Sequence, residues 1–208
     1  MYLNVLLKNY KQKLYERINK KRNNSITNKD LSLITNKCLG GFICHDYGMR
    51  FNSPFVNLWL SVNDFIKICS NLSYYLSLEV IENKELSETM KYPVGNLGDI
   101  VIYFQHYIDF GSAKKKWDER CKRINYSKLY FILTLRGNYD ESLINKFLMI
   151  PYDNKICFVQ KKISDSTVYI TGGGKKNSKG YIWNFKSIFS LKKLYEQFNV
   201  YKWFCKEF

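Results

Sequence analysis

The stretch from Leu31 to Gly48, LSLITNKCLGGFICHDYG, places the strongest constraint on how this chain can fold. Its first five residues form an apolar run with the composition of a buried strand, and a helix is expected to start at Phe42. The polar corner between them contains two glycines, which allow a sharp turn and close approach of a ligand to the backbone. Strand, corner and helix N-terminus form a geometry that binds anions, because the first helical amides are unpaired. The stretch is therefore either a ligand site or a plain connection in which Cys38 and Cys44 are small core residues.

Strand-like and helix-like segments alternate along the rest of the chain. Strands are expected at residues 55–60, 100–104, 129–135, 156–160 and 167–171, and helices at 3–22, 64–76, 112–124, 140–149 and 187–206. Residues 82–91 are left open as a short strand or a surface loop. The run LYFILTL at 129–135 is the most apolar strand and should be central. This alternation predicts an α/β fold, a three-layer Rossmann-like domain with a mostly parallel sheet, over residues 25–208.

A basic amphipathic helix over residues 1–24 is expected to precede this domain. Residues 1–29 hold eight Lys or Arg against Glu16 alone, a net charge of +7, which leaves +8 of the total +15 for the other 179 residues. The modest remainder and the lack of a recognisable module argue against a nucleic-acid partner. An apolar stripe is expected on the helix at Leu3, Leu7, Tyr10, Leu14 and Ile18. Such a helix either lies at an anionic membrane surface or packs its stripe on the domain.

The six cysteines are scattered without a CxxC pair or zinc-site spacing, so neither a metal nor a disulfide framework is expected. No apolar run is long enough to span a membrane, and the N-terminus lacks the features of a signal peptide. We therefore expect the protein in the cytoplasm, or held peripherally at the inner face of the membrane. The segment TGGGKK at 171–176 lacks the spacing of a phosphate-binding loop and is expected to be a plain loop.

A second informative stretch runs from Tyr92 to Tyr107, YPVGNLGDIVIYFQHY. Its first half, with Pro93 and two glycines, is expected to form a turn, and Asp99 lies where this turn meets the strand at 100–104. His106 follows the end of that strand, where open α/β sheets collect functional side chains. Of the two histidines in the chain, His106 is therefore the better candidate for a functional role, and the alternative is a structural histidine.

The chain resembles bacterial proteins labelled as exopolysaccharide or capsular polysaccharide biosynthesis proteins, a family that is itself a domain of unknown function. The resemblance covers residues 25–165. It rests on NKCLGGFICHDYG followed by NSP, on YPVGNLGDI followed by HY, on F-x-x-A-x-x-x-W over residues 110–117, and on Arg120, Arg123, Ile124 and Asn125. The resemblance implies a pathway more than a reaction.

Within that pathway, a glycosyltransferase-like enzyme would join a nucleotide-activated sugar, or another phosphate-bearing donor, to a glycan acceptor. The residues that would hold the donor phosphate are Asn36, Lys37, Gly40, Gly41, Gly95, Asn96, Gly98 and Arg136. The catalytic candidates are His106, or His45 with Asp46, as general base, together with Asp99 and Cys38. No DxD pair is present, so no metal is implied, and no other cofactor is expected.

Two other functions remain open. Cys38 lies beside a helix N-terminus, which lowers the pKa of a thiol, and a histidine partner would make it the nucleophile of an acyl transferase or hydrolase. The sequence places neither histidine beside it. Alternatively, the chain is a non-catalytic member of the assembly machinery. Under the enzymatic hypotheses, residues 30–48, residues 92–107 and the end of the 129–135 strand should converge on one pocket.

Overall fold

The fold is built around a parallel sheet of four strands in a computed structural model that describes residues 2–26, 29–137, 139–159, 167–169 and 192–205. The strands are β1 (Ser32–Thr35), β5 (Leu129–Thr134), β6 (Lys155–Val159) and β7 (Thr167–Tyr169), and they lie side by side in that order. All three pairings are parallel, with Ile34 opposite Phe131 and Leu133 opposite Cys157. The predicted α/β class and parallel sheet are therefore confirmed, and β5 is an inner strand as expected.

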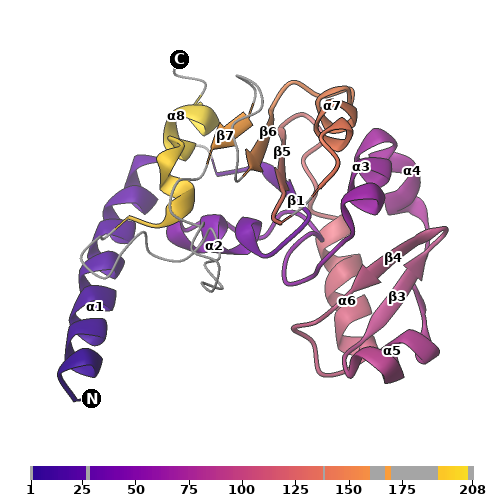
Figure 1. The fold of residues 1–208 in the computed structure, drawn as a ribbon, viewed down its shortest axis with the longest axis horizontal. Helices are drawn as coiled ribbons and strands as arrows, with labels where there is room; N and C mark the ends of the chain where they lie inside the picture. Colours follow the sequence, from indigo (N-terminus) through magenta and orange to yellow (C-terminus); the bar gives the residue numbers. More distant parts are fainter. Residues whose placement is uncertain (1, 27–28, 138, 160–166, 170–191, 206–208) are drawn as a thin grey trace.

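Helices cover both faces of this sheet (Figure 1). Every residue of β5 is buried, and its side chains alternate between two apolar clusters. Phe131 packs with α3 (Val62–Ser70), α4 (Leu72–Ser77), α6 (Phe110–Cys121) and α7 (Ser142–Leu148). Ile132 packs with α2 (Leu39–Asp46), the 3₁₀ helix η1 (Leu194–Gln197) and α8 (Val200–Cys205). This two-sided burial explains why the strand has an unbroken apolar sequence.

A second sheet, antiparallel, was not predicted. It contains β2 (Ile81–Glu82), β3 (Val94–Leu97) and β4 (Ile100–Tyr103), and α5 (Lys84–Met90) connects β2 to β3. The prediction of a turn over residues 93–98 is wrong, because only Gly98, at φ +59°, and Asp99 make the turn between paired Leu97 and Ile100. The strand after the turn was predicted correctly but lies outside the parallel sheet.

The strand predicted at residues 55–60 is also wrong. This segment forms an isolated β-bridge between Trp59 and Tyr103, with N–O distances of 2.9 and 3.0 Å, and the Leu60 N–H donates to the Asn36 carbonyl at 3.2 Å. Asn57 has φ +62°, which breaks the extended conformation that a strand requires. The segment therefore links the two sheets instead of joining either one.

The order of the described strands steps across the sheet in one direction. A doubly wound sheet reverses this order at the point where its ligand binds. The described residues show no such reversal, so the findings support a mixed α/β fold and not a complete Rossmann-like arrangement.

Two helices begin earlier than expected, because a side chain that precedes each predicted start caps the helix. Ser61 caps α3, because its Oγ accepts the Asp64 N–H at 3.0 Å, and the predicted 64–76 helix is divided at Asn71. Asp109 caps α6 by accepting the Ser112 N–H at 2.7 Å, so this helix starts before the predicted residue 112.

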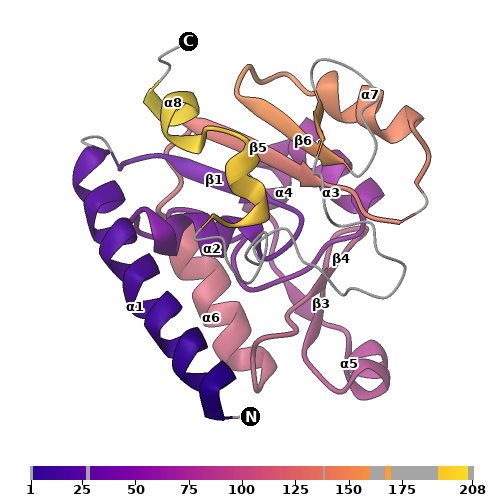
Figure 2. The same cartoon turned by 60° about the vertical axis from the view of Figure 1, so that its left-hand side comes forward.

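The N-terminal helix α1 (Tyr2–Ser25) lies along one flank of the molecule (Figure 1, Figure 2). Its buried side chains include Tyr15 and Asn19, neither of which belongs to the predicted apolar stripe, and Tyr10 of that stripe is 68% exposed. Leu14 and Ile18 of the stripe are only half-buried, so the best-buried contacts of the face that packs on the domain are made by Tyr15 and Asn19, and the predicted amphipathic helix is not confirmed. No helix among the described residues is both long and apolar enough to cross a membrane. The TGGGKK segment lies outside the described residues. The described part of the helix predicted at 187–206 forms two short helices, η1 and α8, instead of one.

Candidate functional site

The site begins at the corner between β1 and α2, where Cys38 is the N-cap residue of the helix. Thr35 shapes this corner, because its Oγ1 donates to the Lys37 carbonyl at 2.7 Å. A Cβ atom on Gly40 would meet that same Oγ1 at 2.8 Å, so only glycine allows the helix to start this close to the strand. The helix starts at Leu39, three residues earlier than predicted, and the earlier start places Cys38 at its N-terminal end.

Cys38 lies in contact with a histidine from the other sheet. The Sγ atom of Cys38 is 3.2 Å from Nε2 of His106, although the two residues are 68 positions apart in the sequence. His106 follows β4, whose last residue is held by the Trp59–Tyr103 bridge. A nucleophile and a base within hydrogen-bonding distance form the arrangement that thiol catalysis requires.

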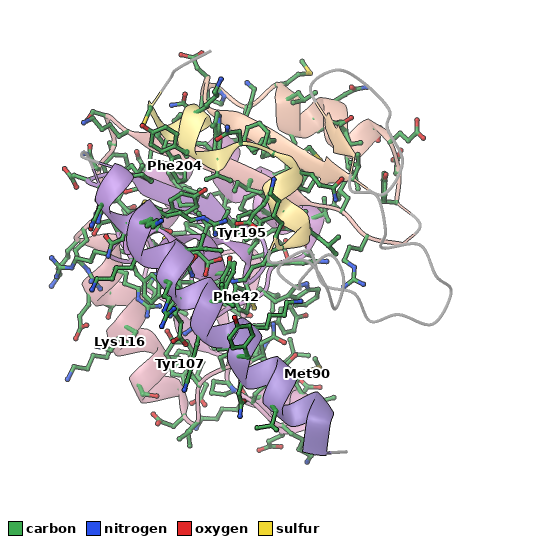
Figure 3. All side chains as sticks on the ribbon, turned by 90° about the vertical axis from the view of Figure 1, so that its left-hand side faces the viewer. Phe42, Met90, Tyr107, Lys116, Tyr195 and Phe204 are labelled. Atoms are coloured by element: carbon green, nitrogen blue, oxygen red, sulfur yellow. The ribbon has the colours of Figure 1, made fainter. Side chains whose placement is uncertain are left out.

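This pair opens on a pocket of about 1240 Å³. Its walls come from α1, the start of α2, the 51–59 segment, the end of α5, the residues after β4, and Lys193. Besides Cys38 and His106, the polar and aromatic side chains that line it include Gln12, Lys37, Phe42, Asn57, Trp59, Tyr92 and Gln105. Figure 3 shows labelled Phe42 and Tyr195 beside α1 and Met90 toward the N-terminal half of this helix. The pocket is large enough for a drug-sized or disaccharide-sized ligand.

The electrostatic surroundings of Cys38 act in opposite directions. Burial raises the pKa of its thiol, and the nearby positive charge of Lys37 lowers it, with burial the stronger influence. Burial and the charge of Arg136 both lower the pKa of Lys37. The resting thiol is therefore protonated, and forming the thiolate requires a base such as His106.

Asp46, at the end of α2, is a structural anchor. Its carboxylate is 1% exposed and accepts hydrogen bonds from Tyr15 and Tyr195 hydroxyls at 2.6 Å each, from Asn19 at 3.0 Å, and from Lys193 at 2.6 and 2.9 Å. Burial alone would raise its pKa, but the hydrogen bonds from Lys193, Tyr15 and Tyr195 and the Lys193 charge lower it. A carboxylate stabilised in this way is a poor proton acceptor.

The sequence matches the domain of unknown function DUF1919 over residues 9–205, almost the whole chain. The chain belongs to the DUF1919 family. A protein of Haemophilus influenzae that is described only as an uncharacterized protein is 37% identical over 191 residues, which are 90% of each chain.

His45 lies on the same side of this DUF1919 protein's α2 as Cys38, two turns or about 10 Å farther along the helix axis. Its side chain is 74% exposed, and Nδ1 lies 3.5 Å from Asp46 Oδ1. His45 and Asp46 therefore line the pocket, at a distance from the Cys38–His106 pair.

Asn36 is committed to the sheet. Its side-chain Oδ1 accepts the Thr134 N–H at 2.9 Å, its Nδ2 donates to the Thr134 carbonyl at 3.2 Å, and the residue is fully buried. These two hydrogen bonds extend the pairing of β1 and β5 by one residue. The side chain is not available to a donor phosphate in this arrangement.

The second group of candidates lies in the antiparallel hairpin, away from the pocket. Asp99 pairs with Lys67 and accepts a hydrogen bond from the Tyr75 hydroxyl at 3.0 Å, at the opposite end of β4 from His106. A Cβ on Gly95 would meet Val80 at 2.6 Å, so packing requires this glycine.

The three remaining candidates, Asn96, Gly98 and Arg136, do not line the pocket either. The Oδ1 atom of Asn96 accepts from Asn83 at 3.2 Å, and Gly98 makes the hairpin turn. Arg136 is near enough to Lys37 to influence its pKa but does not line the pocket. Of the predicted residues, the structure therefore brings together Lys37, Cys38, Gly41, His45, Asp46 and His106.

The sequence reasoning missed the amides and aromatic rings on the pocket wall. Asn57 follows Phe55 and Val56 in a segment interpreted as a strand, and its positive φ was not predicted. Gln105 directly precedes His106, and this position was the sequence signal that could have identified it as a pocket residue. Within the described residues, no three His, Cys, Asp or Glu side chains are arranged to hold a metal ion.

Proposed function

We propose that this DUF1919 protein is a transferase of cell-surface polysaccharide biosynthesis in which Cys38 carries the transferred acyl group. The observation that supports the chemistry is the 3.2 Å contact between Cys38 Sγ and His106 Nε2 at the pocket wall. The resemblance to exopolysaccharide and capsular polysaccharide proteins supports the pathway. We place the reaction in the cytoplasm or at the inner face of the membrane, where activated donors are made.

The geometry favours acyl transfer over transfer of a sugar from a nucleotide. Asn36 is bonded to Thr134, and Gly95 and Gly98 serve packing and turn geometry in the hairpin. Of the eight residues expected to bind the donor phosphate, only Lys37 and Gly41 line the pocket. A Cys–His pair, in contrast, is a complete set of groups for nucleophilic acyl transfer.

The reaction proceeds in two steps. As Sγ attacks the carbonyl carbon of an activated acyl donor, His106 accepts the thiol proton and returns it to the departing group, which leaves a thioester on Cys38. A hydroxyl group of a glycan then attacks the thioester while His106 accepts the hydroxyl proton. The ester forms, the C–S bond breaks, and the proton returns to Cys38. With water as the acceptor, the same steps amount to hydrolysis.

The start of α2 is suited to stabilise the oxyanion of both steps. The helix ladder begins with the Phe42 N–H, which donates to the Cys38 carbonyl, so the preceding N–H groups at Gly40 and Gly41 lie at the positive end of the helix. The Asn57 amide lies beside them, because its Oδ1 is 3.7 Å from where a Gly41 Cβ would be.

The pocket wall next to His106 has the chemistry of a glycan-binding surface. The Trp59 ring is held against Tyr103, with centroids 4.3 Å apart, and faces the pocket together with Tyr92. Aromatic faces accept the C–H side of a sugar ring, and amides such as Gln105 and Asn57 pair with its hydroxyls. We assign this wall to the acceptor.

Acetylation by p-nitrophenyl acetate tests the proposal. We expect mass spectrometry to find one acetyl group on Cys38 and none in the Cys38→Ala protein. In His106→Ala, the acetylation rate should fall about 100-fold, which is the usual contribution of a general base. Cys121, another half-buried cysteine whose pKa burial raises to about 12, gives the matched control Cys121→Ala, which should react like the wild type.

The same variants test the pathway in cells that lack the native gene. Cys38→Ala and His106→Ala should fail to restore the surface polysaccharide or its acyl groups, and Cys121→Ala should restore them. Equal acetylation rates in wild type and His106→Ala, or normal polymer from Cys38→Ala, would contradict the proposed chemistry.

A further inference from the structure

The helix α1 has two faces of different character. At 100° per residue, four exposed basic side chains and two exposed apolar ones lie, together with Asn24, within an arc of about 100°. This outward stripe consists of Leu6, Tyr10, Lys13, Arg17, Lys20 and Lys21. Tyr15, Asn19 and Arg22 lie on the opposite side and point to the domain.

Contacts on the inner face fix which side of α1 faces solvent. Tyr15 and Asn19 both donate to the buried carboxylate of Asp46, and Arg22 pairs with Glu196. These contacts join α1 to α2 and to the segment around η1, so the helix cannot rotate its stripe toward the core without breaking them. The outward stripe is therefore a permanent feature of the surface.

We infer that the outward stripe binds an anionic phospholipid bilayer. Four basic side chains in one row match the negative charge of such a surface. The acid nearest the row, Glu16, is hydrogen-bonded by Gln12 at 3.1 Å. Leu6 and Tyr10, 48% and 68% exposed, continue the row toward the N-terminus.

The two apolar side chains decide between a membrane and another polyanion. A nucleic acid or an acidic polysaccharide would pair with the basic row and leave Leu6 and Tyr10 in water. A lipid interface accepts both, because basic groups bind the headgroups and apolar groups enter the region below them. The helix lies on the bilayer in this arrangement and does not cross it.

Docking through α1 also determines where the pocket lies. Gln12 and Tyr15 of the same helix line the pocket, so a bilayer under the outward stripe would be one helix diameter, about 10 Å, away from it. This inference does not depend on Cys38 chemistry and would hold for any reaction in the pocket.

Co-sedimentation with vesicles tests the inference, with the full-length protein and vesicles of equal parts phosphatidylglycerol and phosphatidylcholine. Binding should be strong, should weaken as salt is added, and should be absent with phosphatidylcholine alone. One basic residue near an anionic surface strengthens binding by about fivefold, so Lys13→Ala with Arg17→Ala should weaken it about 25-fold. The matched control removes two exposed lysines from the α6 region, Lys115→Ala with Lys122→Ala, and should bind like the wild type.

The apolar positions give the deciding comparison. Leu6→Gln with Tyr10→Gln should weaken binding to anionic vesicles and leave binding to heparin, a soluble polyanion, unchanged. Equal vesicle binding by this variant and the wild type would show that charge alone is involved and would overturn the assignment to a membrane. Equal losses in the α1 and α6 variants would overturn the assignment to α1.

Discussion

At the scale of single residues, the chemistry of Cys38 depends on two neighbours that both favour the thiolate, against the effect of burial. His106 is placed to accept the thiol proton, at 3.2 Å, and Lys37 lowers the pKa that burial has raised. A thiol of this kind is unreactive until its proton is removed, which protects it from adventitious oxidation and couples its activation to the histidine.

Replacement of Lys37 by methionine tests this balance. The substitution keeps the length of the side chain and removes its charge, so the pKa of Cys38 should rise further. The rate of alkylation by iodoacetamide should fall severalfold at neutral pH, and its pH profile should move to higher pH. Lys13→Met, which removes a charge from the exposed face of α1, should leave the profile unchanged. A shift to lower pH in Lys37→Met would contradict the proposed influence of Lys37.

Cys38 and His106 could each be predicted from the sequence as a candidate, but the contact between them could not. Cys38 was selected because glycines and a helix start follow it, and His106 because it follows a strand. Their contact depends on the position of β4 relative to β1, which is set by a bridge between Trp59 and Tyr103 that leaves no periodic signal. The structural roles of Asn36 and Gly95 were hidden for a related reason. Asn36 pairs with Thr134, which is distant in the sequence, and Gly95 packs against Val80, which directly precedes the unpredicted strand β2.

At the scale of elements, the Asp46 carboxylate joins three helical segments that are distant in the sequence. Tyr15 and Asn19 belong to α1, Asp46 ends α2, and Lys193 and Tyr195 lie at η1. Removing one member of a buried ion pair leaves the other charge without compensation. The position of α1, and with it one wall of the pocket, therefore depends on the Asp46 carboxylate together with the Arg22–Glu196 ion pair.

Asp46→Asn should lower the free energy of unfolding by about 3 kcal/mol or more at neutral pH. Because the folded-state pKa of Asp46 lies below its value in the unfolded chain, the ionised carboxylate stabilises the fold above about pH 4, and this stabilisation is lost as the pH falls through the folded pKa. The difference between wild type and variant in urea unfolding should thus shrink in acid. Asp99→Asn, at an exposed ion pair, is the control and should leave the stability nearly unchanged.

Elements with a strong periodic signal were predictable, and elements set by distant packing were not. The buried strand β5 and the helix α6 have unambiguous apolar patterns, and both were expected within a few residues of their bounds. The strand β3 contains Gly95 and is followed by Gly98, a spacing that is typical of a turn. The inner face of α1 makes its buried contacts through polar groups because its partner is the Asp46 carboxylate. Apolar periodicity carries no information about a polar interface of this kind.

At the scale of the whole molecule, the site combines segments that are far apart in the sequence, from α1 to Lys193. Cys38 lies at the corner after β1, His106 lies after the end of β4, and α1 together with Lys193 closes the pocket. The N-terminal helix thus has an inner face that belongs to the domain and an outer face that is available to a membrane. Packing and membrane contact, which the sequence presented as alternatives, are compatible because they use different faces.

Deletion of residues 1–24 should therefore have two effects, a loss of stability and a loss of vesicle binding. Tyr15, Asn19 and Arg22 leave with the deleted segment, so the Asp46 carboxylate loses two donors and Glu196 loses its ion pair. A cost of about 3 kcal/mol corresponds to a melting temperature lower by about 10 °C in a chain of this size. The full-length variant in which Lys13, Arg17, Lys20 and Lys21 are all alanine alters only the outer face, and it should lose vesicle binding while keeping the melting temperature of the wild type. An unchanged melting temperature after deletion would show that the inner face of α1 does not stabilise the domain, because differential scanning calorimetry would detect the loss of these buried contacts.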